Sequence, residues 1–259
     1  MSRSVRTVAD TVEEFAAELL AFRVEVNDAV AEVTLLGPGK GNAMGLDFWR
    51  ELPLVFAALD ADPTVLAVVL SGSGKNFSVG LDLMQMLPQW AGVLANGAQA
   101  APRTDFLNEV RRLQAAVTSL AVCRKPIIAA VSGWCIGGGV DLISAADVRL
   151  ASAEAKFSIR EARLAIVADV GSLQRLVGII GEGHLRELSL TGKDIDAVRA
   201  ERIGLVNDVY PDADSVLDAA RTMAAEIAVN PPLAVQGTKQ MLNEGREDRI
   251  ATGLRHVAA

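Results

Sequence analysis

Three acidic residues of this chain, Asp141, Glu161 and Asp169, stand beside turns at which carboxylates could transfer protons. Asp141 follows Gly138 by three residues in CIGGGVDLIS, where the pattern predicts the first turn of a helix. Residues three apart share a helix face, so a ligand held at the Gly138 N–H would lie beside the Asp141 carboxylate. Glycine-rich turns that open helices often bind phosphate, but this carboxylate would repel one. We therefore expect a ligand other than phosphate here.

Each acid also has a plain structural interpretation that the residues alone leave open. Asp141 could be a helix-start aspartate that the helix dipole favours. Glu161 could be a solvated loop charge that follows a short strand. Asp169 could be the N-cap of the helix that begins GSLQRL.

Two segments share one plan, in which a buried strand leads through a glycine-rich turn into a helix. They are VLAVVLSGSGKNFSVGLDL and PIIAAVSGWCIGGGVDLIS. Ligands of α/β sheets gather at the carboxyl ends of the strands, and glycines let the backbone approach them closely. One N–H group from each turn would make an oxyanion hole. The alternative is that both segments are only tight turns between a strand and a helix.

The elements that must position these residues alternate between strands and helices, which predicts an α/β fold with a parallel sheet. Continuous apolar runs at 64–72 and 127–133 predict buried strands. The other main expectations are a helix at 11–21, a hairpin turning at Asn27 and Asp28, a loop at 37–45, helices at 47–62, 105–123 and up to about 146, an irregular loop at 88–103, and a helical tail from Ala213 broken at 230–232. Pro53 is expected near the first turn of its helix.

Composition narrows the function class. The 259 residues are 51% hydrophobic and carry a net charge of -7, which fits a globular chain and argues against nucleic-acid binding. Cys123 and Cys135 offer no disulfide framework, and neither they nor the histidines have metal-ligand spacing. A secretory signal, an apolar run of membrane-spanning length and a C-terminal address signal are not recognised. We therefore expect a cytoplasmic protein without a membrane partner.

A series of motifs over about residues 22 to 245 resembles the crotonase superfamily, the enoyl-CoA hydratases and isomerases. The matching pieces are GKGNAM, SGSGKNFSVGLDL, KPIIAAVSGWCIGGGVDLISAADVRLAS, AKFSIREARLAIVADVGSLQRLVGIIG, AERIGLVNDVYP and PPLAVQGTKQML. The resemblance implies a spiral core of β-β-α units at 22–192 and a C-terminal helical oligomerisation region at 193–259. An N-terminal helical extension at 1–21 lies outside it. The resemblance also implies that the protein assembles as a homotrimer or a dimer of trimers.

The same resemblance implies an oxyanion hole made by the backbone N–H groups of Leu81 and Gly138, which would hold the thioester oxygen of an acyl-CoA. The acids Asp141, Glu161 and Asp169 are similar to those of the Δ3,5-Δ2,4-dienoyl-CoA isomerases of this superfamily. That reaction moves a proton from C2 to C6, and carbons so far apart favour two separate acid–base groups. Glu161 is assigned to C2 and Asp169 to C6, with Asp141 in support.

Residues near both loops, and one near the C-terminus, are expected to contact the substrate and its CoA. They are Lys40, Asn42, Ala43, Lys75, Val79, Gly80, Asp82, Leu83 and Lys239. The lysines could instead be ordinary surface residues, and Lys239 is expected to reach the CoA of a neighbouring subunit. CoA is part of the substrate, so no metal or redox cofactor is implied.

Two other functions stay open. One is an enoyl-CoA hydratase, which uses two acids to activate water and usually has a small residue where Asp169 stands. The other is a non-catalytic acyl-CoA-binding homologue, because a fold does not fix a function. A hydrolase built on Cys135 or Ser132 is disfavoured because neither has a histidine at motif-like spacing.

Overall fold

A β-hairpin is the first element of the computed structural model, which describes residues 19–37, 41–94 and 100–258. Strands β1 (Phe22–Asn27) and β2 (Val30–Leu35) pair antiparallel around a two-residue turn. Asp28 and Ala29 both have positive φ, at 46° and 69°, as a tight hairpin turn requires. The hairpin prediction is confirmed, but the turn lies one residue later than expected, because Asn27 still pairs with Val30. Most of the helix predicted at 11–21 lies outside the described residues. Lys40, expected to contact the CoA, also lies outside them.

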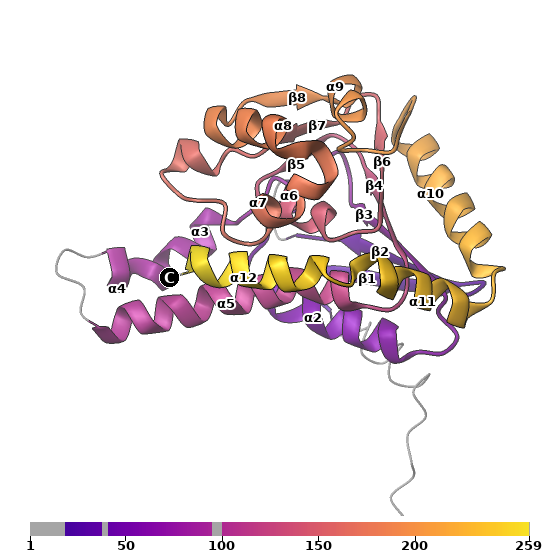
Figure 1. Cartoon of the computed structure of the whole chain (residues 1–259), viewed down its shortest axis with the longest axis horizontal. Coiled ribbons are helices and arrows are strands. Elements are labelled where there is room, and N and C mark those ends of the chain that lie inside the picture. Colours follow the sequence, from indigo (N-terminus) through magenta and orange to yellow (C-terminus); the bar gives the residue numbers. More distant parts are fainter. Residues whose placement is uncertain (1–18, 38–40, 95–99, 259) are drawn as a thin grey trace, which may run out of the picture.

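The hairpin opens a six-stranded sheet in the order β1-β2-β3-β4-β6-β9. The added strands are β3 (Ala67–Gly72), β4 (Ile127–Val131), β6 (Val148–Ser152) and β9 (Asp208–Tyr210). From β2 onward every neighbouring pair is parallel. Parallel pairs need long crossovers, and helices supply several of them (Figure 1). The predicted α/β fold with a parallel sheet is confirmed.

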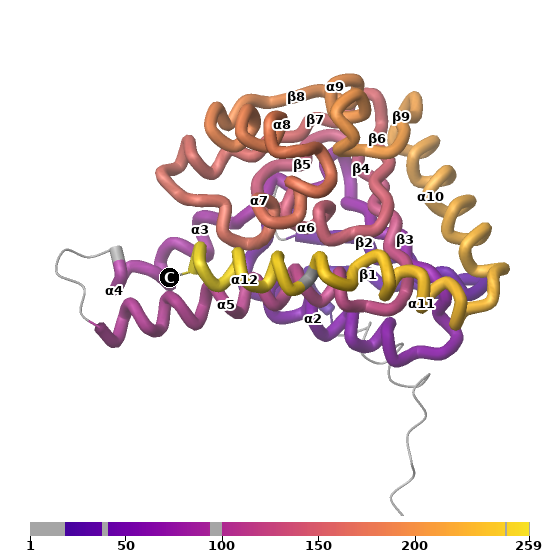
Figure 2. The backbone as a smooth tube through the Cα atoms, viewed as in Figure 1, coloured from indigo at the N-terminus to yellow at the C-terminus, as the bar shows by residue number. Residues whose placement is uncertain are grey.

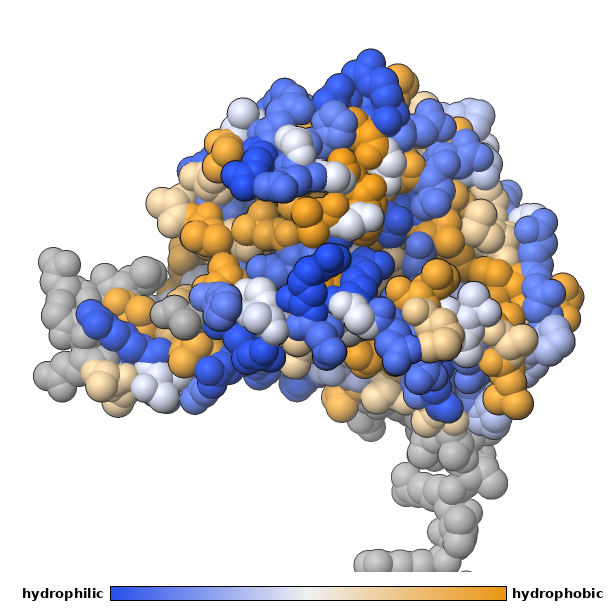
Figure 3. Space-filling view, in the orientation of Figure 1, coloured by the Kyte–Doolittle hydropathy of each residue, from blue (hydrophilic) through white to orange (hydrophobic). Residues whose placement is uncertain are grey.

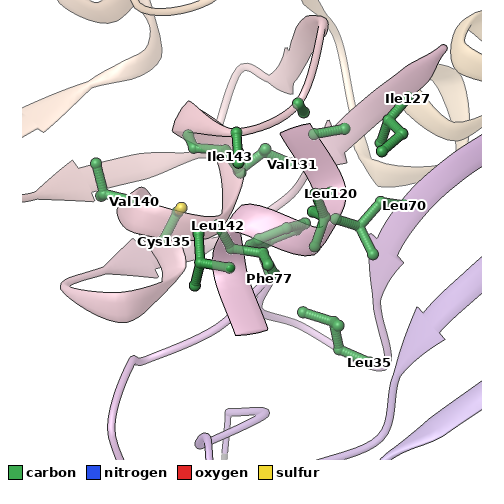
Figure 4. Packing of buried hydrophobic residues seen from close by; sticks show 14 of the residues in the cluster. Leu35, Leu70, Phe77, Leu120, Ile127, Val131, Cys135, Val140, Leu142 and Ile143 are labelled. Carbon is green, nitrogen blue, oxygen red and sulfur yellow. The ribbon is translucent and has the colours of Figure 1, made fainter. Parts of the chain in front are cut away.

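Alternating side chains of the central strands enter two separate cores. Val68 and Leu70 of β3 face the larger core, whereas Val69 faces a smaller one. Figure 4 shows Leu70 and β4 side chains gathered in the larger core with Phe77. Helix α10 (Ala213–Ala228) covers the smaller core through buried residues that include Ala220. Burial on both faces explains why these strands read as continuous apolar runs.

Helices α2 (Leu46–Ala61), α5 (Ala100–Val122) and α6 (Gly138–Ser144) contribute to the larger core. Pro53 lies in the interior of α2, so the expectation that it would lie near the first turn is wrong. Proline lacks an N–H, so the Trp49 carbonyl loses its usual partner four residues on. The buried Trp49, Leu52 and Phe56 hold this helix against the core despite that loss.

A smaller sheet of three short strands, β5-β7-β8, supports the turn before α6. Its strands are β5 (Trp134–Ile136), β7 (Lys156–Ser158) and β8 (Asp194–Asp196). The short strand β7 was predicted, but β5 and β8 were not, because their pairing with β7 joins segments that are distant in sequence. Strand β8 follows the expected boundary at 192–193 directly and pairs with β7. The three-part division of the chain stays a prediction.

The segment expected to be an irregular loop at 88–103 is largely helical where the structure describes it. Helix α3 (Leu83–Met86) leads into the 3₁₀ helix η1 (Leu87–Trp90) and α4 (Ala91–Leu94), and α5 begins at Ala100. The loop expectation is therefore wrong for these residues. Glycine and proline in the segment suggested irregular structure, but Pro88 fits the start of a helix, where its missing N–H costs little.

The remaining elements are mainly helices. They are η2 (Glu161–Leu164), α7 (Ser172–Arg175), α8 (Val177–Thr191), α9 (Ala197–Arg202), α11 (Pro232–Asn243) and α12 (Arg246–Ala258). The predicted helical tail and its break before Pro232 are confirmed. Helix α12 continues from α11 and runs across α5 and beside α7 (Figure 2). Among the described helices, none has the length and apolarity to cross a membrane.

Candidate active site

The three acids and both expected N–H donors line one cavity of about 540 Å³. Asp141 comes from α6, Glu161 from η2, and Asp169 from the segment between η2 and α7. The rest of the lining is mostly apolar, with Leu83, Leu87, Trp90, Phe106, Val110, Leu113, Leu164 and Ile166 among its residues. The structure thus brings together acids that the sequence separates by up to 28 residues. A flexible apolar chain fits this lining.

The backbone N–H groups of Leu81 and Gly138 are free to bind a ligand. In residues 19–37, 41–94 and 100–258, neither N–H donates a hydrogen bond, although the neighbouring Asp82 N–H donates to the Met44 carbonyl at 3.1 Å. A Cβ built on Gly138 would lie 3.8 Å from Leu81 N, so the two turns meet closely. Two such donors side by side could hold one developing oxyanion.

Gly80 permits this close approach. Its φ is +84°, and an added Cβ would lie 2.7 Å from the Ile136 carbonyl oxygen and 3.2 Å from Gly138 N. Both the left-handed backbone and the lack of space exclude a side chain. The glycine-rich turns therefore position two amide groups and are more than tight connections.

Asp141 is 2% exposed, and its Oδ1 accepts a hydrogen bond from the Ser172 N–H at 2.5 Å. Burial raises the pKa of Asp141 to about 6, and the Ser172 bond opposes that rise by favouring the carboxylate. Helix α6 is preceded by Gly137, and the Asp141 carboxylate binds the first residue of α7 instead of its own helix. Asp141 is thus suited to holding the segment that precedes α7.

Glu161 is largely buried, which excludes the solvated loop charge considered from the sequence. Burial and then the negative charge of Asp141 raise the pKa of Glu161 to about 7. Its Oε1 lies 3.2 Å from where a Cβ on Gly137 would be, beside the N–H turn. Its Oε2 has no hydrogen-bond partner in the described part of the chain. A carboxyl with this pKa can accept or release a proton near neutral pH.

Asp169 is partly buried, and this burial raises the pKa of its carboxyl. The N-cap of α7 is Gly171, with a φ of 135° and no side-chain cap, so Asp169 is not the N-cap considered from the sequence. The Asp169 carbonyl accepts a hydrogen bond from Gln114 Nε2 at 2.7 Å. Asp169 and the neighbouring Val170 both line the cavity.

Aromatic and basic lining residues were missed from the sequence. Trp90 and Phe106 pack edge to face, with ring centroids 5.5 Å apart. Trp134 has Lys156 Nζ 5.3 Å and Arg160 Cζ 5.4 Å from its ring centroid, a distance suited to cation–π attraction. Trp90 lies in the segment that matched no motif, so only its aromatic type could have drawn attention to it.

The residues expected to contact the substrate divide into two groups. Val79, Gly80 and Leu83 line the cavity, whereas Asn42, Ala43, Lys75 and Asp82 do not. The Asn42 side chain is buried and donates to the carbonyls of three residues of the 73–77 loop. The Asp82 carboxylate caps α3 by accepting from two N–H groups. Lys75 is exposed at the loop.

Lys239 does not fit the expected role of contacting the CoA of a neighbouring subunit. Its side chain is 7% exposed, and its Nζ lies 2.7 Å from Asp147 Oδ2 and 2.9 Å from the Lys125 carbonyl. The ammonium group is therefore bound within its own chain. The expectation failed because its partner Asp147 is distant in sequence.

Comparison with known proteins shows which family the chain belongs to. The profile of the enoyl-CoA hydratase/isomerase family matches residues 25–258. The chain belongs to this family. The expected crotonase-type fold is confirmed by that match and by a solved enoyl-CoA hydratase/isomerase from Xanthobacter autotrophicus Py2, with a TM-score of 0.82 and 29% identity over 92% of this chain and 86% of that one.

Two curated relatives of this family member carry a more specific name. The mitochondrial Δ(3,5)-Δ(2,4)-dienoyl-CoA isomerase of Dictyostelium discoideum is 46% identical over 91% of this chain and 81% of its own length. The peroxisomal enzyme of the same name from Arabidopsis thaliana is 38% identical over 96% of this chain and 89% of its own. The resemblance inferred from the motifs is confirmed.

The same relatives contradict the expected cytoplasmic location. They are named as mitochondrial and peroxisomal proteins. The expectation was based on the lack of a recognised secretory signal, which separates secreted proteins from others but does not distinguish one organelle from another.

Proposed function

We propose that this protein isomerises 3,5-dienoyl-CoA to 2,4-dienoyl-CoA. One observation carries the proposal: Asp169, a third acid, lines the same cavity as Glu161 and the free N–H groups of Leu81 and Gly138. Two relatives bear the name of this activity. CoA is part of the substrate, and we propose no separate cofactor.

Proton transfer begins at C2. The Glu161 carboxylate takes a proton from C2, and the released electron pair moves toward the thioester carbonyl oxygen. The N–H groups of Leu81 and Gly138 stabilise the negative charge on that oxygen. A pKa of about 7 makes Glu161 a stronger base than an exposed glutamate, while it is still ionised near neutral pH.

Proton transfer ends at C6. The dienolate carries its charge along the conjugated chain, and the Asp169 carboxyl gives a proton to C6 as the double bonds move to positions 2 and 4. Burial raises the pKa of Asp169 and so favours its protonated form. Each turnover leaves Glu161 protonated and Asp169 ionised, and exchange with solvent restores both. Asp141 supports the site by holding Ser172.

An absorbance assay tests the proposal. The purified protein is incubated with a 3,5-dienoyl-CoA, and the conjugated 2,4-diene is followed by its absorbance. Crotonyl-CoA is tested in parallel for hydration. We expect rapid diene formation with weak hydration, and robust hydration without diene formation would overturn the proposal.

The hydratase alternative is favoured by one feature, the pair of buried acids Asp141 and Glu161, whose charges influence each other. Two acids that bind one water are what hydration requires. A non-catalytic acyl-CoA-binding protein would show binding by titration calorimetry without turnover of either substrate. The same pair of substrates therefore distinguishes all three functions.

We also propose that the protein assembles as a homotrimer or a dimer of trimers. Apolar side chains on α11 support assembly, since Leu233 is 84% and Leu242 74% exposed in the single chain. Light scattering coupled to size exclusion should give three or six times the chain mass of 27.3 kDa. A mass of one chain at micromolar concentration would contradict the proposal.

A further inference from the structure

We propose that Gln114 is a positioning residue for Asp169 and that it makes the C-terminal helix α12 part of the active site. This inference depends on the proposed function, because it assigns Asp169 the proton transfer at C6. Gln114 lies on α5, is 6% exposed and is not among the residues that line the cavity. It would therefore act through Asp169 and not on the substrate.

The Gln114 amide uses both of its N–H donors. Nε2 donates to the Asp169 carbonyl at 2.7 Å and to the Leu254 carbonyl at 3.0 Å. The two acceptors lie on segments far apart in sequence, one before α7 and the other in the last turns of α12. Because the amide is buried, replacing it would leave the Asp169 carbonyl without this donor and would remove the side-chain bond that ties α12 to it.

The segment that carries Asp169 has few other hydrogen bonds to fix it. It runs from Ala165, with a φ of 58°, to Gly171, with a φ of 135°, and forms no helix or strand. Asp141 holds the far end through Ser172 N–H, and Gln114 holds Asp169 itself. The two contacts come from α6 and α5, so the segment is fixed between elements of the larger core.

Helix α12 completes this arrangement. Ile250 and Leu254 are 1% and 7% exposed, so the inner face of α12 is buried. Figure 3 shows mostly hydrophilic residues on its outer face. Helix α12 lies against both α5 and α7. A shift of α12 would therefore move the Leu254 carbonyl and change the position of the amide that holds Asp169.

The inference predicts that the two proton transfers respond differently to loss of Gln114. Glu161 lies on η2 and is not bound by Gln114, so deprotonation at C2 should persist. Protonation at C6 should slow, because displacement of a reacting group by about 1 Å can cost about 100-fold in rate. If Gln114 had only a structural role, its loss would lower the rates of both proton transfers together or of neither.

The experiment compares the full-length chain with Gln114→Met, which keeps the size but removes both donors. Diene formation and exchange of the C2 hydrogen are measured with 3,5-dienoyl-CoA in D₂O. We expect diene formation to fall by at least about 10-fold and C2 exchange to stay near the unaltered rate. Gln240→Met, on the exposed side of α11, is the matched control and should change neither.

Several outcomes would overturn the inference. Unchanged diene formation in Gln114→Met, or equal loss of both transfers in a folded variant, would contradict it. If Gln114→Met does not fold, Gln114→Glu replaces it, since a protonated glutamate keeps one donor. Diene formation by that variant should then improve at lower pH relative to the unaltered chain, and a parallel pH profile would count against the inference. No diene formation by the unaltered chain would refute the proposed function itself.

Discussion

At the scale of residues, Glu161 and Asp169 share one cavity but are held differently. Glu161 lies against the Gly137 turn with one oxygen unpartnered among the described residues, whereas Asp169 is fixed through its backbone carbonyl. Burial raises the pKa of both acids. The negative charge of Asp141 also raises the pKa of Glu161, so protonation of Asp141 or of Glu161 should change the pKa of the other.

The raised pKa of Glu161 predicts the low-pH limb of the rate profile. The base must be ionised to accept the C2 proton, and its pKa is raised to about 7. Activity should therefore be present above this value and be lost as pH falls through it, about tenfold in kcat/KM per pH unit. The measurement is kcat/KM for diene formation between pH 5 and 9. A rate that stays constant down to pH 5 would contradict the assignment of Glu161 as the base. Glu161→Gln should abolish the activity and, with it, the low-pH limb of the profile.

At the scale of elements, two strand–turn–helix units make the site by bringing their turns together. The turn after β3 supplies the Leu81 N–H, and the turn after β5 supplies the Gly138 N–H. The small sheet of β5, β7 and β8 was not expected, yet it supports the second turn. The units could be predicted from glycine, apolar runs and spacing, but a three-residue strand depends on partners that are distant in sequence.

Gly80→Ala tests whether close contact of the turns is needed. A Cβ there would lie 2.7 Å from the Ile136 carbonyl oxygen and would force the two N–H groups apart. We expect diene formation to fall by about 100-fold or more, the usual effect of losing one oxyanion donor. The measurement is kcat together with a thermal melt.

Gly74→Ala is the matched control for this prediction. Gly74 also has a positive φ, at +69°, but an added Cβ would meet nothing within 4 Å. Both variants share the cost of a left-handed alanine, on the order of 1 kcal/mol. Equal loss of activity in the two would show that backbone strain, and not the close contact, matters.

At the scale of the whole molecule, the sequence predicted the parts of the site that lie next to their own strands. Gly138 and Asp141 lie within ten residues of the end of the buried strand β4, so their neighbourhood could be inferred. The positions of Trp90 and Lys239 could not be predicted. Trp90 lines the cavity from a helical segment that was expected to be a loop. Lys239 pairs with Asp147, which is distant in sequence. Tertiary packing decides such positions, and it leaves no local pattern.

The link from α12 through Gln114 to Asp169 belongs to the same scale. Residues 114, 169 and 254 lie on three separate elements, and only the complete fold brings them together. The site thus depends on the C-terminal helix, although that helix contributes no residue to the cavity.

The most direct test of the central claim is diene formation by Asp169→Asn. Asparagine has nearly the same shape but cannot give a proton to C6, so the rate should fall by about 100-fold to 10,000-fold. Acyl-CoA binding and the thermal melt should be unchanged, and Asp214→Asn on the exposed first turn of α10 should retain full activity. Retained diene formation in Asp169→Asn would contradict the account.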